Sequence, residues 1–294
     1  MTVWLYGLSW VRNYITSIWH DAWRALQYTL RDLPTIATLL LLILPWWSLL
    51  ILRDNFRWLD LFGESTSIAF AFWWMSRSGA APAPVIKKPR LEFLFAMALI
   101  LIWVGWRIGI CTNAFPFLPA KFNCFKSLEF ETIPKVFEQV VLPFAVLFFM
   151  GYGFRAQGVN WSWRAWWIAL PALLAVAGYG IYFHYQDLPK FGTSNLEYFF
   201  GAGLPEEFLF RSILLTRLEA WWKSPAWAVF GSSAIFGLTH LPINYLVFHP
   251  NDMRETWITL LTFQMGLGAV FAFAYQRIRN IWPLALLHTI IDAI

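Results

Sequence analysis

Apolar stretches long enough to cross a bilayer recur along the sequence and restrict its fold more than any other feature. A helical span needs about 20 predominantly apolar residues. Nine stretches approach or reach this length, at approximately residues 35–52, 65–77, 91–110, 136–154, 165–185, 196–216, 225–240, 256–276 and 281–294. The second and the last are short. We therefore expect an all-α fold, a polytopic transmembrane helix bundle of about eight to nine membrane helices. Residues 35–294 would form a single membrane-embedded domain.

The composition excludes a soluble enzyme and a disordered chain. Hydrophobic residues make up 59% of the 294 residues and charged residues only 13%, whereas soluble domains carry about a quarter charged residues. The net charge of +5 is best explained by loop cations that face anionic lipid. No basic stripe with interleaved aromatic residues indicates a nucleic-acid partner. We expect an integral, multi-pass membrane protein in contact with the lipid bilayer.

Residues 1–34 are predicted to form an amphipathic interfacial segment. Over residues 10–31, polar and apolar side chains separate at helical spacing, which is typical of a helix lying in the membrane interface. A helix packed across the ends of the bundle is the alternative.

The connecting segments bear on topology and on redox state. When Lys and Arg are assigned to alternating span ends, the excess on the N-terminal side favours a cytoplasmic N-terminus. Lys135 is counted among the loop cations of the opposite side.

Cys111 and Cys124 bracket one loop. They could form a disulfide or remain two unpaired thiols, and the sequence favours neither alternative.

Two adjacent carboxylates and an arginine interrupt the predicted span 196–216. Insertion of one charge at a helix centre costs roughly 2.5–3.5 kcal/mol, so such residues need partners and a purpose. Glu207 and Arg211 are four residues apart and can pair on one helix face. Glu206 points about 100° away and lacks that partner. Its low-dielectric setting disfavours the charged form, which suits a general base. The alternative is one structural ion network.

Two histidines and an aspartate in the following spans extend this group. Phe236 and His240 close the predicted span 225–240, and His288 and Asp292 lie one turn apart in the last segment. Each pair is weak evidence alone. However, Glu206 is ~15 Å into its helix, and the span assignments bring His240 and His288 to the same depth. We expect the three residues to meet.

These motifs give the C-terminal third a family resemblance. Glu206-Glu207-xxx-Arg211, Phe236-xxx-His240 and His288-xxx-Asp292 occur in the order found in the CPBP (CAAX protease and bacteriocin-processing, Rce1-like) intramembrane protease family. The resemblance covers residues 200–294 and implies a catalytic core over 196–294. Ser212 stands where a glycine commonly follows the arginine, which we expect to affect packing more than chemistry.

The resemblance implies an intramembrane endopeptidase that hydrolyses a peptide bond of a membrane-associated protein or peptide. Glu206 would activate water, and His240 would assist as a ligand or an acid–base partner. His288 and Asp292 would position the water or stabilise the oxyanion. Glu207 with Arg211 would hold the helix and tune Glu206, and Phe236 would support the site.

Metal use and two other functions stay open at this level. Glu206, His240, His288 and Asp292 include suitable zinc ligands, yet the same residues suit a metal-free glutamate mechanism, which we favour slightly. A non-catalytic membrane scaffold or immunity-type protein on the same fold is the main alternative. A proton-coupled transporter is less favoured because no internal repeat is evident. The sequence does not specify the substrate, its prenylation or the oligomeric state.

Overall fold

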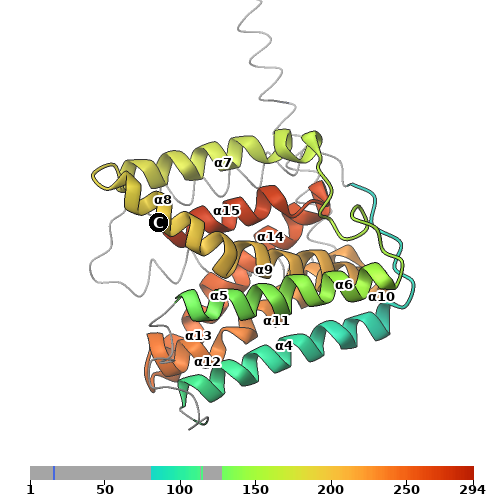
Figure 1. Ribbon diagram of the computed structural model, residues 1–294, viewed down its shortest axis with the longest axis horizontal. Helices are drawn as coiled ribbons and strands as arrows, with labels where there is room; N and C mark the ends of the chain where they lie inside the picture. Colours follow the sequence, from blue (N-terminus) through green and yellow to red (C-terminus); the bar gives the residue numbers. More distant parts are fainter. Residues whose placement is uncertain (1–15, 17–80, 113, 115–127) are drawn as a thin grey trace, which may run out of the picture.

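The computed structural model describes residue 16, residues 81–112, residue 114 and residues 128–294, and these ranges are helical with no strand (Figure 1). The proposed amphipathic helix, apart from the helical Thr16, lies outside the described residues. The predicted spans 35–52 and 65–77 also lie outside them, as does Cys124. The total of eight to nine spans, the interfacial helix and the Cys111–Cys124 alternative therefore remain predictions.

Of the first three long helical stretches, the first and third follow the predicted spans 91–110 and 165–185 within two residues, whereas the second begins and ends earlier than the predicted span 136–154. α4 (Pro89–Cys111) begins with a proline in its first turn, where the missing backbone N–H is not needed. α5 (Leu128–Val136), η2 (Phe137–Val141) and α6 (Leu142–Phe149) follow one another without a break. α7 (Trp163–Phe183) is capped by the preceding Ser162, whose side chain accepts a hydrogen bond from the backbone N–H of Ala165.

The two glutamates and Arg211 lie in a helical run that is longer than the predicted span 196–216. It consists of α8 (Leu188–Tyr198), η3 (Phe199–Gly203), α9 (Leu204–Glu206), η4 (Glu207–Leu215) and α10 (Thr216–Trp222). The segments η3 and η4 are π-helical, a local geometry often found at functional sites. The run ends at Lys223, which adopts the left-handed conformation with φ of 53°.

Three further stretches complete the described bundle. α11 (Pro225–Thr239) continues past His240 into α12 (Leu241–Ile243) and η5 (Asn244–Phe248). α13 (Met253–Thr259), η6 (Leu260–Gln264) and α14 (Met265–Ile278) form the next stretch, and α15 (Trp282–Ala293) is the last. The last two stretches match the predicted spans 256–276 and 281–294 within three residues, whereas the first begins as predicted at residue 225 and continues eight residues past the predicted end at 240.

Four helices in the described part of the chain are long and apolar enough to cross a membrane: Pro89–Cys111, Thr132–Phe149, Trp163–Tyr182 and Pro225–Phe248. Their outer faces carry large exposed apolar side chains, such as Leu94 and Leu101 on α4 and Trp167 and Leu174 on α7. Such surfaces are unfavourable in water and suited to lipid. The described helices are therefore those of an integral membrane protein.

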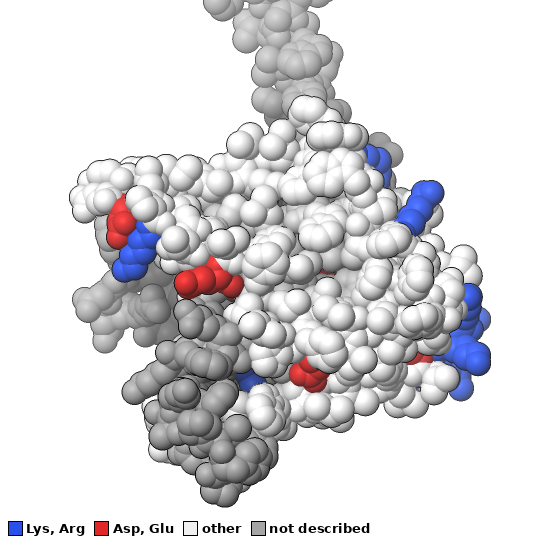
Figure 2. All heavy atoms as spheres, in the orientation of Figure 1, with Lys and Arg blue, Asp and Glu red and all other residues white. Residues whose placement is uncertain are grey.

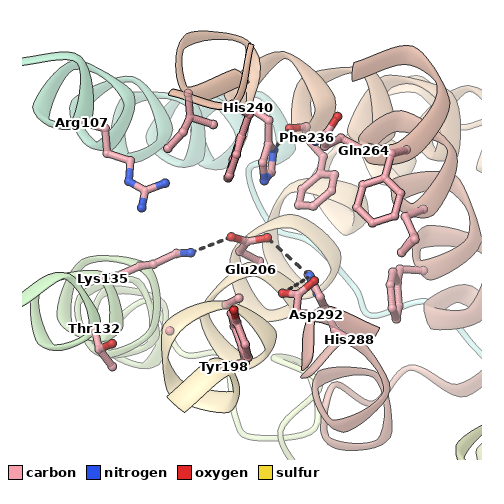
Figure 3. A pocket seen from close by; sticks show the side chains of 17 residues that line it. Arg107, Thr132, Lys135, Tyr198, Glu206, Phe236, His240, Gln264, His288 and Asp292 are labelled. Carbon is pink, nitrogen blue, oxygen red and sulfur yellow. Dashed lines mark hydrogen bonds and ion pairs between the residues drawn. The ribbon is translucent and has the colours of Figure 1, made fainter. Parts of the chain in front are cut away.

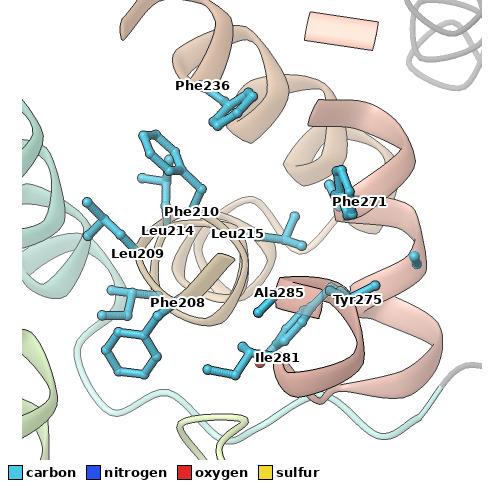
Figure 4. Packing of buried hydrophobic residues seen from close by; sticks show 14 of the residues in the cluster. Phe208, Leu209, Phe210, Leu214, Leu215, Phe236, Phe271, Tyr275, Ile281 and Ala285 are labelled. Carbon is cyan, nitrogen blue, oxygen red and sulfur yellow. The ribbon is translucent and has the colours of Figure 1, made fainter. Parts of the chain in front are cut away.

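The part of this run from η3 to α10 lies at the centre of the bundle, where α4, α11, α14 and α15 pack around it, whereas α8 has no buried residue (Figures 1 and 4). Every residue from Phe208 to Leu215 is buried, including the charged Arg211. α15 approaches closely at Gly203, because a Cβ atom there would overlap the backbone oxygen of Ala285 and the hydroxyl of Thr289. This close crossing fixes α15, and therefore His288, beside the two glutamates.

Candidate active site

A cavity of about 230 Å³ lies at the end of the bundle where α11 ends and α5 begins. Its walls combine apolar side chains with a small number of polar groups, as ligand sites generally do. Glu206, His240, His288 and Asp292 all line it, and Figure 3 shows their side chains converging from three separate helical stretches. The structure thus brings together the three residues that were expected to share one depth.

Glu206 is buried at the centre of this group. One carboxylate oxygen, Oε1, lies 2.6 Å from Nζ of Lys135, and the other, Oε2, lies 3.8 Å from Nε2 of His288 (Figure 3). Arg211 pairs with Glu207, as expected, but Glu206 has a cationic partner of its own, Lys135, which was not predicted from the sequence. The partner comes from α5, more than 70 residues earlier, because the packing of α5 against η3 and α9 brings the two side chains together.

His288 is held between the two glutamates. Its Nδ1 lies 2.9 Å from Oε1 of Glu207. Because a carboxylate only accepts, this contact assigns a proton to Nδ1. Nε2 then faces the cavity, toward Glu206 and toward Oδ2 of Asp292 at 3.5 Å. A histidine oriented by one carboxylate and presented to a second is a familiar acid–base arrangement.

Glu207 and Arg211 lie behind the cavity and do not line it. The predicted pair forms, with Nε of Arg211 3.4 Å from Oε2 of Glu207, and both side chains are fully buried. The guanidinium also lies 4.5 Å from the ring centroid of Phe236, a favourable cation–π geometry. Glu207 therefore contacts His288 on one side and Arg211 on the other, in a position suited to orienting rather than reacting.

His240 faces the cavity from the end of α11. Its Nδ1 lies 2.9 Å from the backbone oxygen of Phe236, to which it donates in this geometry. This leaves Nε2 as the ring atom available for proton transfer. The Phe236 ring packs 4.8 Å from the His240 ring, so this phenylalanine contacts both the histidine and Arg211. The expected supporting position of Phe236 matches this packing.

Ser212, the departure from the family pattern, lies away from the cavity. Its side chain is fully buried and donates a hydrogen bond to the backbone oxygen of Gln157. This bond ties η4 to the segment that precedes α7. The contact is one of packing, as expected.

The ammonium of Lys135 occupies Oε1 of Glu206, and this cation disfavours a metal ion at the same oxygen. The Nδ1 atoms of both histidines are committed to Phe236 and Glu207, which leaves their Nε2 atoms toward the cavity. Within the described ranges, no three His, Cys, Asp or Glu side chains are arranged to hold one. A cationic group beside Glu206 is instead supplied by the chain itself.

Several lining residues have no counterpart among the predicted site residues. Lys135, Thr132 and Arg107 form the wall contributed by α4 and α5, and Tyr198 and Gln264 lie on other sides (Figure 3). The sequence did contain one signal, a single lysine beside an otherwise apolar segment. The predicted span 136–154 leaves Lys135 in the preceding loop, whereas the helix begins at Leu128 and includes this lysine.

Comparisons with known proteins agree with the motif-based resemblance. Residues 189–294 match the family described as type II CAAX prenyl endopeptidase, Rce1-like. No curated protein and no solved structure matches the chain. The matched segment contains Glu206, His240 and His288 but not Lys135 or Arg107. The family implies a protease with a protein substrate in a membrane context. The similarity to the Rce1-like family of type II CAAX prenyl endopeptidases thus covers residues 189–294, the same part of the chain that carries the three motifs.

Proposed function

We propose that the protein is an intramembrane endopeptidase in which Glu206 activates water to hydrolyse a peptide bond of a membrane-associated protein or peptide. The observation that carries this proposal is the position of Glu206. A buried carboxylate lines a cavity beside the Nε2 face of His288, with His240 on the same cavity. A carboxylate base and imidazole groups within one enclosed space are the components that peptide hydrolysis needs.

The residues divide into acid–base groups and orienting groups. Glu206 takes a proton from water as the water oxygen attacks the peptide carbonyl. Nε2 of His240 and of His288 are in position to hold the water or to pass a proton to the leaving nitrogen. Glu207 fixes the His288 tautomer through Nδ1. The 25% exposed Asp292 helps to position Nε2 from the cavity side.

We favour a metal-free mechanism on the arrangement of these side chains. The ammonium of Lys135 occupies the place beside Glu206 that a metal ligand site would have to leave open. The expected result is full activity after exhaustive chelation, with no stoichiometric metal by elemental analysis. Activity lost on chelation and restored by Zn²⁺ would contradict this mechanism without affecting the protease assignment.

The end of the bundle away from the cavity carries a group of cationic side chains, whose charge indicates which side of the membrane the cavity faces. We name this group the basic end; it comprises Lys87, Lys88, Arg90, Arg155, Arg164, Lys223, Arg277 and Arg279. Figure 2 shows Lys and Arg side chains along that edge. Two of these residues contact α10: Arg279 pairs with Glu219 at 2.8 Å, and Arg90 lies over the Trp221 ring. By the positive-inside rule the basic end is cytoplasmic, so the cavity faces the other side and favours exported substrates.

Comparing protein termini in membranes that contain the wild-type chain or Glu206→Gln tests the proposal. We expect new C-termini in one or more membrane-associated proteins with the wild type and their loss with the variant. Glu197→Gln, an exposed position on α8, is the matched control. Identical termini with the wild type and Glu206→Gln, alongside a phenotype that both proteins support, would favour a non-catalytic scaffold instead.

A further inference from the structure

Lys135 reaches Glu206 from outside the segment that matches the family. It belongs to α5, its side chain is only 6% exposed, and its Nζ lies 2.6 Å from Oε1 of Glu206. The same Nζ lies 5.1 Å from the ring centroid of Trp103, which is itself buried on α4. Two helices that precede the matched segment thus hold an ammonium group in the wall of the cavity.

Stability alone is a weak reason for a lysine at this position. Removing two charges from water costs several kcal/mol per ion, and a buried ion pair often adds no more stability than apolar side chains of similar volume. The ammonium also lines the cavity, whereas the Glu207–Arg211 pair is sealed behind it. Of these two buried pairs, only Lys135–Glu206 is placed to meet a substrate.

We propose that Lys135 is a further catalytic residue, whose ammonium group stabilises the oxyanion formed when water attacks the peptide carbonyl. This inference rests on the proposed function of Glu206. Before reaction the negative charge beside Lys135 is on the Glu206 carboxylate. Once Glu206 takes the proton from water, that charge has moved to the carbonyl oxygen. An ammonium group already in place stabilises the negative charge first on the carboxylate and then on the carbonyl oxygen, with little reorganisation. Such preorganised charge is the basis of electrostatic catalysis.

The step balances without a further reactant. A bond forms between the water oxygen and the carbonyl carbon, and the carbonyl π electrons pass to the oxygen, which becomes an anion. The water proton goes to Glu206. The tetrahedral intermediate then collapses, the carbon–nitrogen bond breaks with its electrons on nitrogen, and the proton held by Glu206 completes the amine, either directly or by way of a histidine Nε2. Lys135 stays protonated throughout, because it contributes charge and N–H donors only.

The experiment compares variants reconstituted in lipid vesicles, using internally quenched peptides with an apolar anchor as the probe. Lys135→Met keeps the length of the side chain and removes the charge. We expect kcat to fall roughly 10²–10³-fold, the usual effect of losing one oxyanion donor, with KM changed less than about threefold. Lys190→Met, at an exposed position on α8, should retain the wild-type rate.

Chemical rescue separates catalysis from folding. Lys135→Ala lacks the atoms of propylammonium, so added propylammonium should restore part of the rate while neutral 1-propanol should not. Thermal unfolding measured in parallel shows whether rescue acts on stability. Rescue of the rate without a rise in unfolding temperature supports the proposal. Equal rates with both additives, or no rescue by propylammonium, would overturn it.

The remaining outcomes distinguish this inference from the function on which it rests. If the wild type cleaves and Glu206→Gln does not, but Lys135→Met has the wild-type kcat, only the role of Lys135 fails. A faster Lys135→Met enzyme would also overturn it, since the lysine would then hold Glu206 inactive. A rise confined to KM would make Lys135 a substrate-binding residue. Equal cleavage by wild type and Glu206→Gln would defeat the proposed function itself.

Discussion

At the scale of single residues, the surroundings of Glu206 and Glu207 separate their roles. Glu206 lines the cavity and contacts Lys135 and His288, whereas Glu207 contacts His288 from behind and pairs with Arg211. Both glutamates therefore contact the same imidazole, one at each ring nitrogen. Glu207 thus orients the His288 ring through Nδ1, and Nε2 faces the side of the cavity where Glu206 lies.

Replacing Glu207 with glutamine should lower activity by disturbing the His288 tautomer. A glutamine amide can donate as well as accept, so it permits the proton to leave Nδ1. In the Ser-His-Asp enzymes, the corresponding change of an orienting carboxylate to its amide lowers kcat about 10⁴-fold. We expect kcat for Glu207→Gln to fall roughly 10²–10⁴-fold with KM little changed. Steady-state kinetics on vesicles measures both quantities.

The control for this variant is Glu197→Gln, which makes the same chemical change at an exposed site on α8. Its kcat should equal that of the wild type. If Glu207→Gln had a wild-type kcat as well, Glu207 would not orient His288, and the contact at 2.9 Å would be structural only.

The contact of Lys135 with Glu206 could not be predicted from the sequence, although other features of the site could. The motif residues could be identified because their charges interrupt apolar segments at recognisable spacings. The Glu207–Arg211 pair could be predicted because it is local, four residues apart along one helix. The partner of Glu206 could not be predicted in this way. It lies on a helix distant in the sequence, and its position depends on how α5 packs against η3 and α9.

At the scale of helices, the crossing of α15 over the run from α8 to α10 sets the geometry of the site. Gly203 is three residues before Glu206, and it allows α15 to approach at Ala285 and Thr289. His288 is on the same stretch of α15. The distance between Glu206 and His288 is therefore controlled by a contact that involves neither side chain.

Gly203→Ala should lower activity more than it lowers expression of the protein. The added methyl group overlaps the backbone oxygen of Ala285, which cannot move without shifting α15. Overpacking of this kind typically costs 1–3 kcal/mol, and a displacement of about 1 Å at a catalytic group can cost about 10²-fold in rate. Peptide cleavage and thermal unfolding of the purified variant test both effects.

Gly192→Ala on α8 is the matched control, because nothing lies within 4 Å of a Cβ atom at that position. It should retain the wild-type rate and unfolding temperature. A Gly203→Ala protein with unchanged rate and stability would show that α15 adjusts freely, contrary to the packing described.

A third buried ion pair joins α4 to α10. Nε of Arg217 lies 3.1 Å from Oε2 of Glu92, and the two side chains are 0% and 1% exposed. Tyr152 donates a hydrogen bond to the other oxygen of Glu92 at 2.5 Å. This network connects α4, which precedes the matched segment, to the run that carries the motif.

Arg217→Met should destabilise the protein by roughly 3–5 kcal/mol, because it leaves the Glu92 carboxylate buried without its cationic partner. Denaturant unfolding in detergent measures the change. The double variant Glu92→Leu with Arg217→Met should recover much of the loss, and Arg254→Met, at an exposed position, should have little effect. An Arg217→Met protein as stable as the parent would show that the pair contributes no stability.

Helix positions were largely predictable from the sequence, but their local geometry was not. Predicted spans such as 91–110 and 225–240 match α4 and α11 within two residues, because long apolar segments in lipid have few alternatives to a helix. The π-helical stretches η3 and η4 could not be predicted. They change the direction of side chains within a helix without changing its hydrophobicity, and the neighbouring helices determine where they occur.

At the scale of the whole molecule, the basic end and the cavity lie at opposite ends of the described bundle. The helix α7 joins them, with Arg155 before its start and Gln186 after its end. Both positions are exposed. Orientation in the membrane can therefore be measured with one pair of variants.

Gln186→Cys should react with a membrane-impermeant thiol reagent in intact cells, whereas Arg155→Cys should react only after the membrane is opened. The positive-inside rule gives this direction, because Arg155 belongs to the basic end. The unsubstituted chain is labelled in parallel to account for its own cysteines. Labelling of Arg155→Cys alone in intact cells would reverse the orientation and favour cytosolic substrates.

The most direct test of the central claim is hydrolysis by the purified protein in lipid vesicles, carried out in water labelled with heavy oxygen. The wild type should cleave an anchored peptide and place one labelled oxygen in the new C-terminal carboxylate. Glu206→Gln should lower the rate roughly 10²–10⁴-fold, the usual contribution of a general base, while Glu197→Gln should not. A Glu206→Gln protein that cleaves at the wild-type rate, or a product without the label, would contradict water activation by Glu206.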